Sequence, residues 1–365
     1  MAQQLFNTVF GDFSLYQPDA HTQAHSQADN YLLEQLHARN LQEQSLAIIN
    51  DNYAALATVL QDFAPACYND SAIYHYCLRR NLPEHTLAQH TIDQLSQAKE
   101  KVFLLRLPKS LHFLNYILAE LSCLPDITVL VSGMQKHWPS SFYQAAEHYF
   151  DKVDVLDGVK KAKCMVLSQG KAIQDVEATI QLDLEEFDLK LCNYPNVFSR
   201  EQLDIGSRFL LENFPDLSAA SSVLDLACGN GVLGIYAQKK VPELYAHYID
   251  ESAFAVQSCL ASLALNGIDA SRYQVLQNHV LYGLNLKDID VVLCNPPFHQ
   301  HQQVSIRIGS EMIKQSKRCL AKDGVMYLVA NQQLPYFNLL QKQFRQVSAL
   351  ANNSKFVIYQ ASEPF

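Results

Sequence analysis

Short runs of apolar residues alternate with amphipathic segments along most of this 365-residue chain. Runs with the length and composition of buried strands recur at 45–51, 66–70, 101–107, 127–131, 163–167, 223–226, 245–251, 273–277, 290–294, 325–330 and 355–360. Apolar residues at helical spacing separate several of these runs, for example at 111–121. Strands that alternate with helices are typical of an α/β fold with a largely parallel sheet. The pattern therefore predicts two such domains, with a boundary near the strand-like stretch 180–192.

Composition narrows the class of protein. With 48% hydrophobic and 18% charged residues, the chain is globular and long enough for two cores. No run approaches the roughly 18 apolar residues of a membrane-spanning helix, and no signal peptide is visible. Nine cysteines without a C-x-x-C pair are interpreted as reduced thiols of a cytoplasmic protein. Histidine pairs at 21/25 and 299/301 lack a third ligand nearby, so no metal site is predicted.

The stretch from Ser222 to Gly234 carries the first candidate chemistry. It has the pattern of a strand, a turn containing Gly229 and Gly231, and a helix, which is the form of a nucleotide-type cofactor site. The glycines permit positive φ and a close approach of a ligand to the backbone. Asp225, near the end of the strand, would repel a pyrophosphate but would suit a cationic ligand. The D-x-x-x-G-x-G pattern resembles motif I of S-adenosylmethionine-dependent methyltransferases; the alternative is an ordinary turn.

A second strand and a proline-rich tetrapeptide favour the cofactor interpretation. The run 245–251 ends in Asp250 and Glu251, where an α/β sheet places a carboxylate on a ribose. After the run 290–294 comes the tetrapeptide Asn295-Pro296-Pro297-Phe298. Its prolines stiffen the loop and remove two backbone donors, so that the Asn295 oxygen and a proline carbonyl remain as acceptors. Acceptors would hold the protons of an exocyclic amino group, while Phe298 stacks on the base; the alternative is a rigid turn.

The front half repeats the order of the back half at an offset of about 180 residues. The stretch 68–72 mirrors 248–253, and 103–108 mirrors 291–296. At the glycine turn the front half has Asn50–Ala54 without a glycine, and Arg106–Lys109 replaces the tetrapeptide. Because residues with a side chain adopt positive φ only at a cost, we predict a degenerate copy that no longer binds cofactor. Two unrelated α/β domains are the alternative.

Together these residues resemble the bacterial guanine-N2 methyltransferases of ribosomal RNA that carry a degenerate methyltransferase domain before a catalytic one. The resemblance is carried by 196–200, 203–206, 293–300, 318–320 and 352–356. It is closest to the large-subunit branch, and the small-subunit branch is the nearest competitor. It implies an α/β protein of two tandem Rossmann-like class I methyltransferase domains, the first degenerate and serving RNA binding or rigidity. We place them at 1–185 and 186–365.

The resemblance also implies a reaction: methyl transfer from S-adenosyl-L-methionine to the N2 amino group of one guanine in 23S rRNA. The target base must be unstacked, so protein-free or incompletely assembled rRNA is the expected substrate, with no membrane or DNA partner. The net charge of −9 argues against broad nonspecific nucleic-acid binding but leaves room for a local basic patch. Alternatives are methylation of 16S rRNA, of a protein glutamine or of a DNA adenine, and an RNA-folding factor with a vestigial pocket.

By position, the resemblance assigns roles to individual residues. Those expected to hold the cofactor are Asp225, Gly229, Gly231, Asp250, Glu251, Asn278 and Phe198. Asn278 follows the third strand and would contact the adenine, or else cap a turn. Phe198 would cover the methionine or adenine, or else be a core aromatic. Those expected to hold the guanine are Asn295, Pro296, Pro297 and Phe298. Ala227 departs from the family at a position where glycine is usual.

Overall fold

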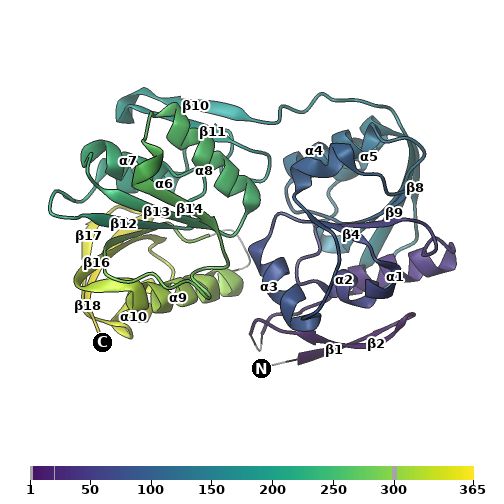
Figure 1. Ribbon diagram of the computed structural model, residues 1–365, viewed down its shortest axis with the longest axis horizontal. Helices are drawn as coiled ribbons and strands as arrows, with labels where there is room; N and C mark the ends of the chain where they lie inside the picture. Colours follow the sequence, from purple (N-terminus) through teal and green to yellow (C-terminus); the bar gives the residue numbers. More distant parts are fainter. Residues whose placement is uncertain (1–2, 20, 298–301) are drawn as a thin grey trace. The chain divides into compact units, whose positions relative to one another are not determined.

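The computed structural model describes residues 3–19, 21–297 and 302–365, and it forms two compact α/β units (Figure 1). Unit 1 comprises Met1–Ala178 and unit 2 comprises Thr179–Phe365. Each unit is organised around its own seven-stranded sheet, with helices on both faces (Figure 1). The fold is therefore the expected pair of Rossmann-like domains.

Unit 2 begins with a hairpin and a helix that precede the sheet. The hairpin pairs β10 (Ile180–Leu184) with β11 (Leu189–Asn193), and the helix is α6 (Ile205–Glu212). The sheet strands are β12 (Ser222–Leu226), β13 (Tyr245–Asp250), β14 (Tyr273–Gln277), β15 (Ile289–Cys294), β16 (Leu320–Asn331), β17 (Phe344–Asn352) and β18 (Phe356–Pro364). The helices between them are α7 (Val232–Lys240), α8 (Ala253–Leu265), α9 (Gln302–Cys319) and α10 (Tyr336–Gln341).

Unit 1 has the same plan after a small antiparallel pair, β1 (Gln3–Thr8) and β2 (Gly11–Tyr16). Its sheet strands are β3 (Leu46–Ile49), β4 (Ala66–Tyr68), β5 (Gln89–His90), β6 (Val102–Arg106), β7 (Thr128–Met134), β8 (Phe150–Val155) and β9 (Ala162–Gly170). Its helices are α1 (Gln27–Ala38), α2 (Ala55–Val59), α3 (Ala72–Asn81), α4 (Leu111–Ser122) and α5 (Ser140–Tyr149).

The two sheets share one topology. The strand order is β5-β4-β3-β6-β7-β9-β8 in unit 1 and β14-β13-β12-β15-β16-β18-β17 in unit 2. Numbered from the first sheet strand of each unit, both orders are 3-2-1-4-5-7-6. In both sheets the first five strands are parallel and the last two pair antiparallel. An identical order in two consecutive units supports a duplication over two unrelated α/β domains.

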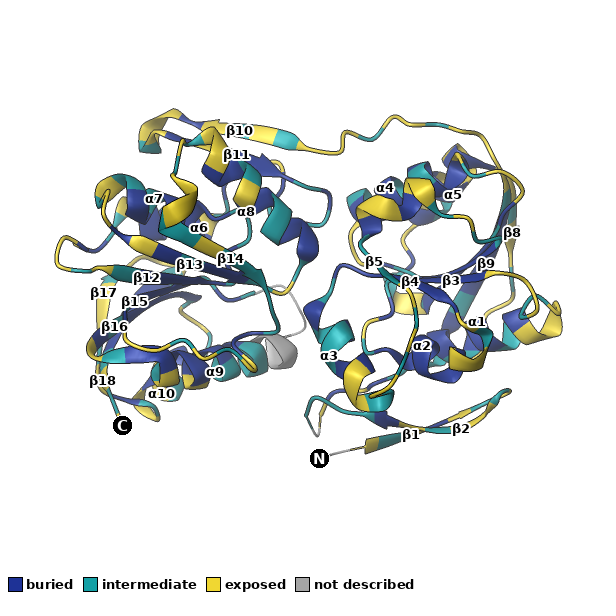
Figure 2. Cartoon of the chain, viewed as in Figure 1, coloured by how far each residue is buried: buried dark blue, intermediate teal, exposed yellow. Residues whose placement is uncertain are grey.

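The central strands are buried on both faces (Figure 2). In β12, Val223 belongs to the apolar cluster on one side of the sheet, whereas Leu224 and Leu226 belong to the cluster on the other. This division follows from the alternation of side chains along a strand. Each such leucine contributes about 1.5–3 kcal/mol when it is removed from water, so the apolar runs fix the centre of each sheet.

Several elements were not expected from the sequence. The edge strand β17 exposes most of its residues, and β8 is similarly exposed, so neither has a continuous apolar run. Gly206 lies inside the first turn of α6 and does not interrupt the helix. Ser71 stands at the start of α3, but its side chain makes no capping hydrogen bond to that helix.

Two features are absent from the part of the chain that the structure describes. No helix there is both long and apolar enough to cross a membrane. No group of three or more His, Cys, Asp or Glu side chains there could hold a metal ion.

Candidate active site

The candidate residues of unit 2 meet at one edge of its sheet. Strands β12, β13, β14 and β15 are parallel neighbours, so their carboxyl ends lie side by side. Leu226, the last residue of β12, is level with Ile249 on one side and Cys294 on the other. The turn after β12, Asp250 and Asn295 therefore surround the same edge. Asn278 follows β14, the next strand outward.

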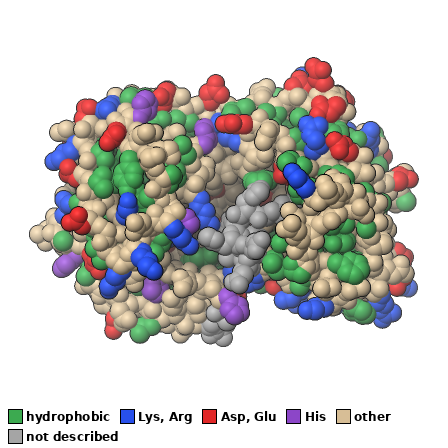
Figure 3. Space-filling model, turned by 180° about the vertical axis from the view of Figure 1, so that it is seen from behind, with side chains coloured by type: hydrophobic (Ala, Val, Ile, Leu, Met, Phe, Trp, Pro, Cys, Tyr) green, Lys and Arg blue, Asp and Glu red, His purple; other side chains and the backbone are tan. Residues whose placement is uncertain are grey.

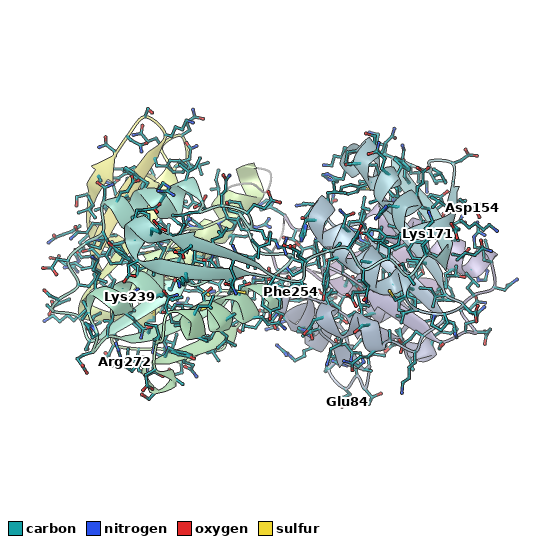
Figure 4. The ribbon with its side chains drawn as sticks, turned by 90° about the horizontal axis from the view of Figure 1, so that it is seen from above. Glu84, Asp154, Lys171, Lys239, Phe254 and Arg272 are labelled. Carbon is teal, nitrogen blue, oxygen red and sulfur yellow. The ribbon has the colours of Figure 1, made fainter. Side chains whose placement is uncertain are left out.

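Charged side chains at the other end of the sheet are remote from this edge. Lys239 lies in the last turn of α7 and Arg272 precedes β14, so both lie at the amino ends of the parallel strands, away from Phe254 in the first turn of α8 (Figure 4). Lys239 pairs with Asp188 at 2.6 Å. These two cations are therefore not part of the candidate site.

The turn after β12 has the backbone conformation that the glycines were expected to permit. Gly229 has φ +54° and Gly231 has φ +82°. A Cβ on Gly231 would lie 2.7 Å from Sγ of Cys259, whereas a Cβ on Gly229 would meet no atom within 4 Å. Gly231 thus allows the turn to pack on α8, and Gly229 leaves open space for a ligand.

Ala227 adopts the same left-handed conformation without being a glycine, at φ +62°. Its N–H donates to the carbonyl of Ile249 at 2.8 Å, which ties the start of the turn to β13. An L-residue in this region costs about 1–2 kcal/mol. Ala227 therefore holds this turn at a cost in backbone strain.

Asp250 joins the turn to the start of the next helix. Its carboxylate accepts from the N–H of Gly229 at 2.9 Å and from the N–H of Ser252 at 3.0 Å. Burial raises the pKa of this carboxyl, and the two backbone donors oppose the rise. The carboxylate is therefore fixed at the end of β13 beside Gly229. Glu251, the next residue, is exposed.

Asp225 lies deeper than the sequence suggested. Its carboxyl is 1% exposed, and Oδ2 accepts from the N–H of Gly234 in α7 at 2.9 Å. Its Oδ1 has no partner among the described residues. Burial raises the pKa of Asp225 to about 8. In this arrangement the side chain links the strand to the helix beneath the turn.

Asn278 is held in a turn by hydrogen bonds, whereas Phe198 is exposed. The N–H of Asn278 donates to the carbonyl of Asp250 at 2.8 Å, and its Nδ2 donates to the carbonyls of Val280 and Tyr282 at 3.1 and 3.2 Å. Asn278 therefore closes a turn, which was one of its two expected roles. Phe198 is 53% exposed, so it is not a core aromatic.

Asn295 has the most defined environment of the candidate residues. Its Nδ2 donates to Oδ2 of Asp204 at 2.6 Å and to Oγ of Ser207 at 2.9 Å. Its Oδ1 is buried and has no partner among the described residues. Pro296 is buried and Pro297 is partly exposed, whereas Phe298 lies outside the described residues.

Asp204 and Ser207 were not singled out as site residues from the sequence. They lie 91 and 88 residues before Asn295, and no spacing rule connects the two segments. The local signal was a helix start: the carboxylate of Asp204 caps α6 by accepting from the N–H of Ser207 at 2.8 Å. That signal predicts a cap but not a contact with the tetrapeptide.

The equivalent edge of unit 1 is occupied by its own side chains. The carboxylate of Asp51 accepts from the N–H groups of Ala55 and Ala57, both at 3.0 Å, at the start of α2. Arg106, which stands where unit 2 has Asn295, pairs with Asp29 at 2.6 Å. In unit 1, Asp51 therefore occupies the start of the helix, and the Arg106–Asp29 pair occupies the position that corresponds to Asn295.

The turn of unit 1 nevertheless has the left-handed backbone conformation without a glycine. Asn50 adopts φ +62° and Ala54 adopts φ +59°, although neither is a glycine. The N–H of Asn50 donates to the carbonyl of Tyr68, as that of Ala227 does to Ile249. Unit 1 thus keeps the conformation of the turn at a cost in strain. The two units differ instead in the side chains that occupy this edge of the sheet, which in unit 1 are Asp51 and the Arg106–Asp29 pair.

Two family models and several curated relatives together match most of the chain. The RLMG N-terminal domain model matches residues 4–171, and the Methyltransferase small domain model matches residues 188–360. Ribosomal RNA large subunit methyltransferase G of Pseudoalteromonas translucida is 33% identical over 96% of this chain and 94% of its own. The protein of the same name from Aeromonas salmonicida is 34% identical over 98% of this chain and 99% of its own.

A solved structure has the same fold. A 16S rRNA N2 methyltransferase of T. thermophilus, in complex with AdoMet and guanosine, superposes with a TM-score of 0.77 at 17% identity. The superposition covers 99% of this chain and 98% of that one. At this level of identity the match establishes the two-domain fold.

Proposed function

Because the chain belongs to the ribosomal RNA large subunit methyltransferase G family, we propose that it methylates the N2 amino group of a guanine in 23S rRNA with S-adenosyl-L-methionine. The observation that carries the proposal is the Oδ1 of Asn295, which is buried at the edge of the sheet and has no partner among the described residues. A buried acceptor without a partner is costly. A substrate amino group would supply the missing donor.

The residues around the turn fit the proposed cofactor. When bound, S-adenosylmethionine supplies an activated methyl group on a sulfonium. The open space at Gly229 allows a close approach to the backbone, and the carboxylate of Asp250 beside it can accept hydrogen bonds from ribose hydroxyls. Asn278 and Glu251 lie at the ends of the adjacent strands, where the adenosine would extend. Asp225 supports the turn from below, and exposed Phe198 would close over the cofactor.

The proline-rich loop fits a planar amino group. Asn295 Oδ1 and the carbonyl of Pro296 accept the two N2 protons, which holds the nitrogen and orients its lone pair. The same oxygens stabilise positive charge that develops on the nitrogen during transfer. Phe298 would stack on the guanine. A base must leave its stack to reach such a site, so protein-free or partly assembled 23S rRNA is the proposed substrate.

We assign no cofactor to unit 1, because Asp51 and the Arg106–Asp29 pair occupy its equivalent edge. Its proposed role is to bind RNA or to add rigidity. Acidic and basic side chains are interspersed on the face shown in Figure 3, so a local cluster, and not a broad basic surface, would make the RNA contacts.

The test is methyl transfer by the purified full chain and by its Asn295→Ala variant. Protein-free 23S rRNA should be labelled at guanine N2, and the variant should lose about 100-fold or more of the activity, since a transition-state contact is removed. The matched control is Asn285→Ala, an exposed asparagine in the same unit. Mass mapping of methylguanosine in rRNA from cells that lack the protein identifies the position.

Other substrates separate the competing functions. Preferred labelling of 16S rRNA, DNA or a protein glutamine would replace 23S rRNA as the target. If Asn295→Ala kept every cellular effect of the wild type, the protein would be an RNA-folding factor and not a methyltransferase.

A further inference from the structure

The first turn of α6 surrounds the side-chain amide of Asn295. Asp204 precedes the helix, Gly206 is buried within its first turn, and Ser207 is 6% exposed. Both protons of the Asn295 amide are used, one by the Asp204 carboxylate at 2.6 Å and one by the Ser207 hydroxyl at 2.9 Å. The nitrogen therefore has no further proton to donate.

These contacts fix which way the amide faces. A carboxylate can only accept, so the group that faces Asp204 must be the amide nitrogen. Turning the amide over would place its oxygen against the negative charge of Asp204 and would lose a charge-assisted hydrogen bond. The oxygen is thus held in the opposite direction, where it has no partner among the described residues.

Gly206 leaves the space that this orientation needs. A Cβ at position 206 would lie 3.2 Å from Oδ1 of Asn295 and 3.2 Å from Oδ2 of Asp204. Such contacts are tighter than ordinary van der Waals contact, so a side chain there would displace the amide or cover its oxygen. The helix turn therefore combines two anchors for the nitrogen with clearance beside the oxygen.

We propose that Asp204 and Ser207 are positioning residues that lock the Asn295 carboxamide with its oxygen toward the substrate, so that the site accepts only a hydrogen-bond donor. An amino group satisfies such a site, and a carbonyl is rejected because the amide cannot present a proton. The charge on Asp204 also polarises the amide and makes its oxygen a stronger acceptor. In this inference the identity of the substrate rests on the proposed function, whereas the orientation of the amide is independent of it.

The orientation can be measured without catalysis. In the full chain labelled with ¹⁵N-asparagine, the Asn295 NH₂ signals are assigned by their loss in Asn295→Ala. We expect slow proton exchange with solvent in the wild type. Asp204→Ser keeps a residue that caps α6 but lacks the carboxylate, and we expect it to speed exchange about tenfold, since a hydrogen bond to a charged group is lost. Ser207→Ala should have a smaller effect of the same sign.

Kinetics of the same variants provide the second readout. Asp204→Ser should lower kcat at least about tenfold and leave KM for rRNA within about threefold. The control is Asp269→Ser, because Asp269 caps another turn of unit 2 by accepting from the N–H of Ser271 and makes no contact with Asn295 that the structure describes. It should change neither readout.

The outcomes separate the two proposals. Unchanged Asn295 exchange in Asp204→Ser would overturn the positioning role. So would a loss of stability in Asp204→Ser with kcat retained. A wild type that methylates no rRNA while its Asn295 protons respond as expected would overturn the proposed function and leave the orientation of the amide standing.

Discussion

At the scale of single residues, a substitution at Ala227 measures the backbone strain in the turn after β12. The φ of Ala227, +62°, is costly for alanine and free for glycine. Replacing Ala227 with glycine would remove this strain. Part of the gain in stability is offset, because glycine loses more conformational entropy than alanine on folding. We therefore expect Ala227→Gly to raise the free energy of unfolding of unit 2 by about 0.5–1 kcal/mol, measured by denaturant titration with circular dichroism.

The control is the same substitution where glycine should do harm. Ala264 is exposed in helix α8, so Ala264→Gly should lower stability by about 1 kcal/mol. A loss of stability in both variants would show that the turn at 227 is not strained.

Part of the candidate site could be predicted from the residue types alone. Two glycines and an Asn-Pro-Pro sequence are unusual enough to be located without a structure, and both lie at the expected strand ends. Asp204 was not predicted as a neighbour of Asn295, because a hydrogen bond across 91 residues depends on how α6 packs. The depth of Asp225 was likewise not readable, since a strand residue near an end can face the pocket or the helix.

At the scale of elements, the start of helix α2 should make unit 1 sensitive to pH. Asp51 is buried where it accepts from two N–H groups of that helix, and burial raises its pKa to about 7 from 3.8. Between these values the folded protein keeps a proton that the unfolded chain has released. Stability of unit 1 must therefore fall as pH rises through this window and level off above about 7.

Asp51→Asn removes this titration and keeps the shape of the side chain. Relative to the wild type, the variant should gain about 2–3 kcal/mol between pH 5 and pH 8, because the wild type loses about 1.4 kcal/mol per pH unit up to about pH 7. The fluorescence of Trp138 reports unit 1 directly, because it is the only tryptophan of the chain and is buried there. Asp62→Asn, an exposed position nearby, is the control. A pH-independent difference between wild type and Asp51→Asn would contradict the prediction.

A strand could be predicted from the sequence where both of its faces are buried. Strands such as β6 and β12 are buried on both faces and appear as continuous apolar runs. Strand β17 lies at the edge of its sheet with one largely exposed face, so its sequence of mixed residues carries no comparable signal. Strand β5 has only two residues and is defined by pairing with β4.

At the scale of the whole molecule, one topology occurs twice with different occupants at the same edge. Unit 2 leaves an amide oxygen without a described partner and an open glycine, whereas unit 1 places Asp51 and the Arg106–Asp29 pair there. The repeat of the strand order was predictable from the matching segments. The side chains that fill the edge of unit 1 are held by contacts between distant segments. The sequence therefore indicated a changed edge, through the missing glycines and the replaced tetrapeptide, but not which contacts fill it.

This difference predicts that the cofactor stabilises one unit only. A ligand present at 100 times its Kd adds about 2.7 kcal/mol to the unit that binds it. S-adenosylmethionine should therefore raise the thermal transition of unit 2, followed by circular dichroism, and leave the Trp138 fluorescence transition of unit 1 in place. Should both transitions rise, Gly231→Val separates the causes, because a side chain there would collide with Cys259. If the Trp138 transition still responds to the cofactor in that variant, unit 1 binds it and is not degenerate.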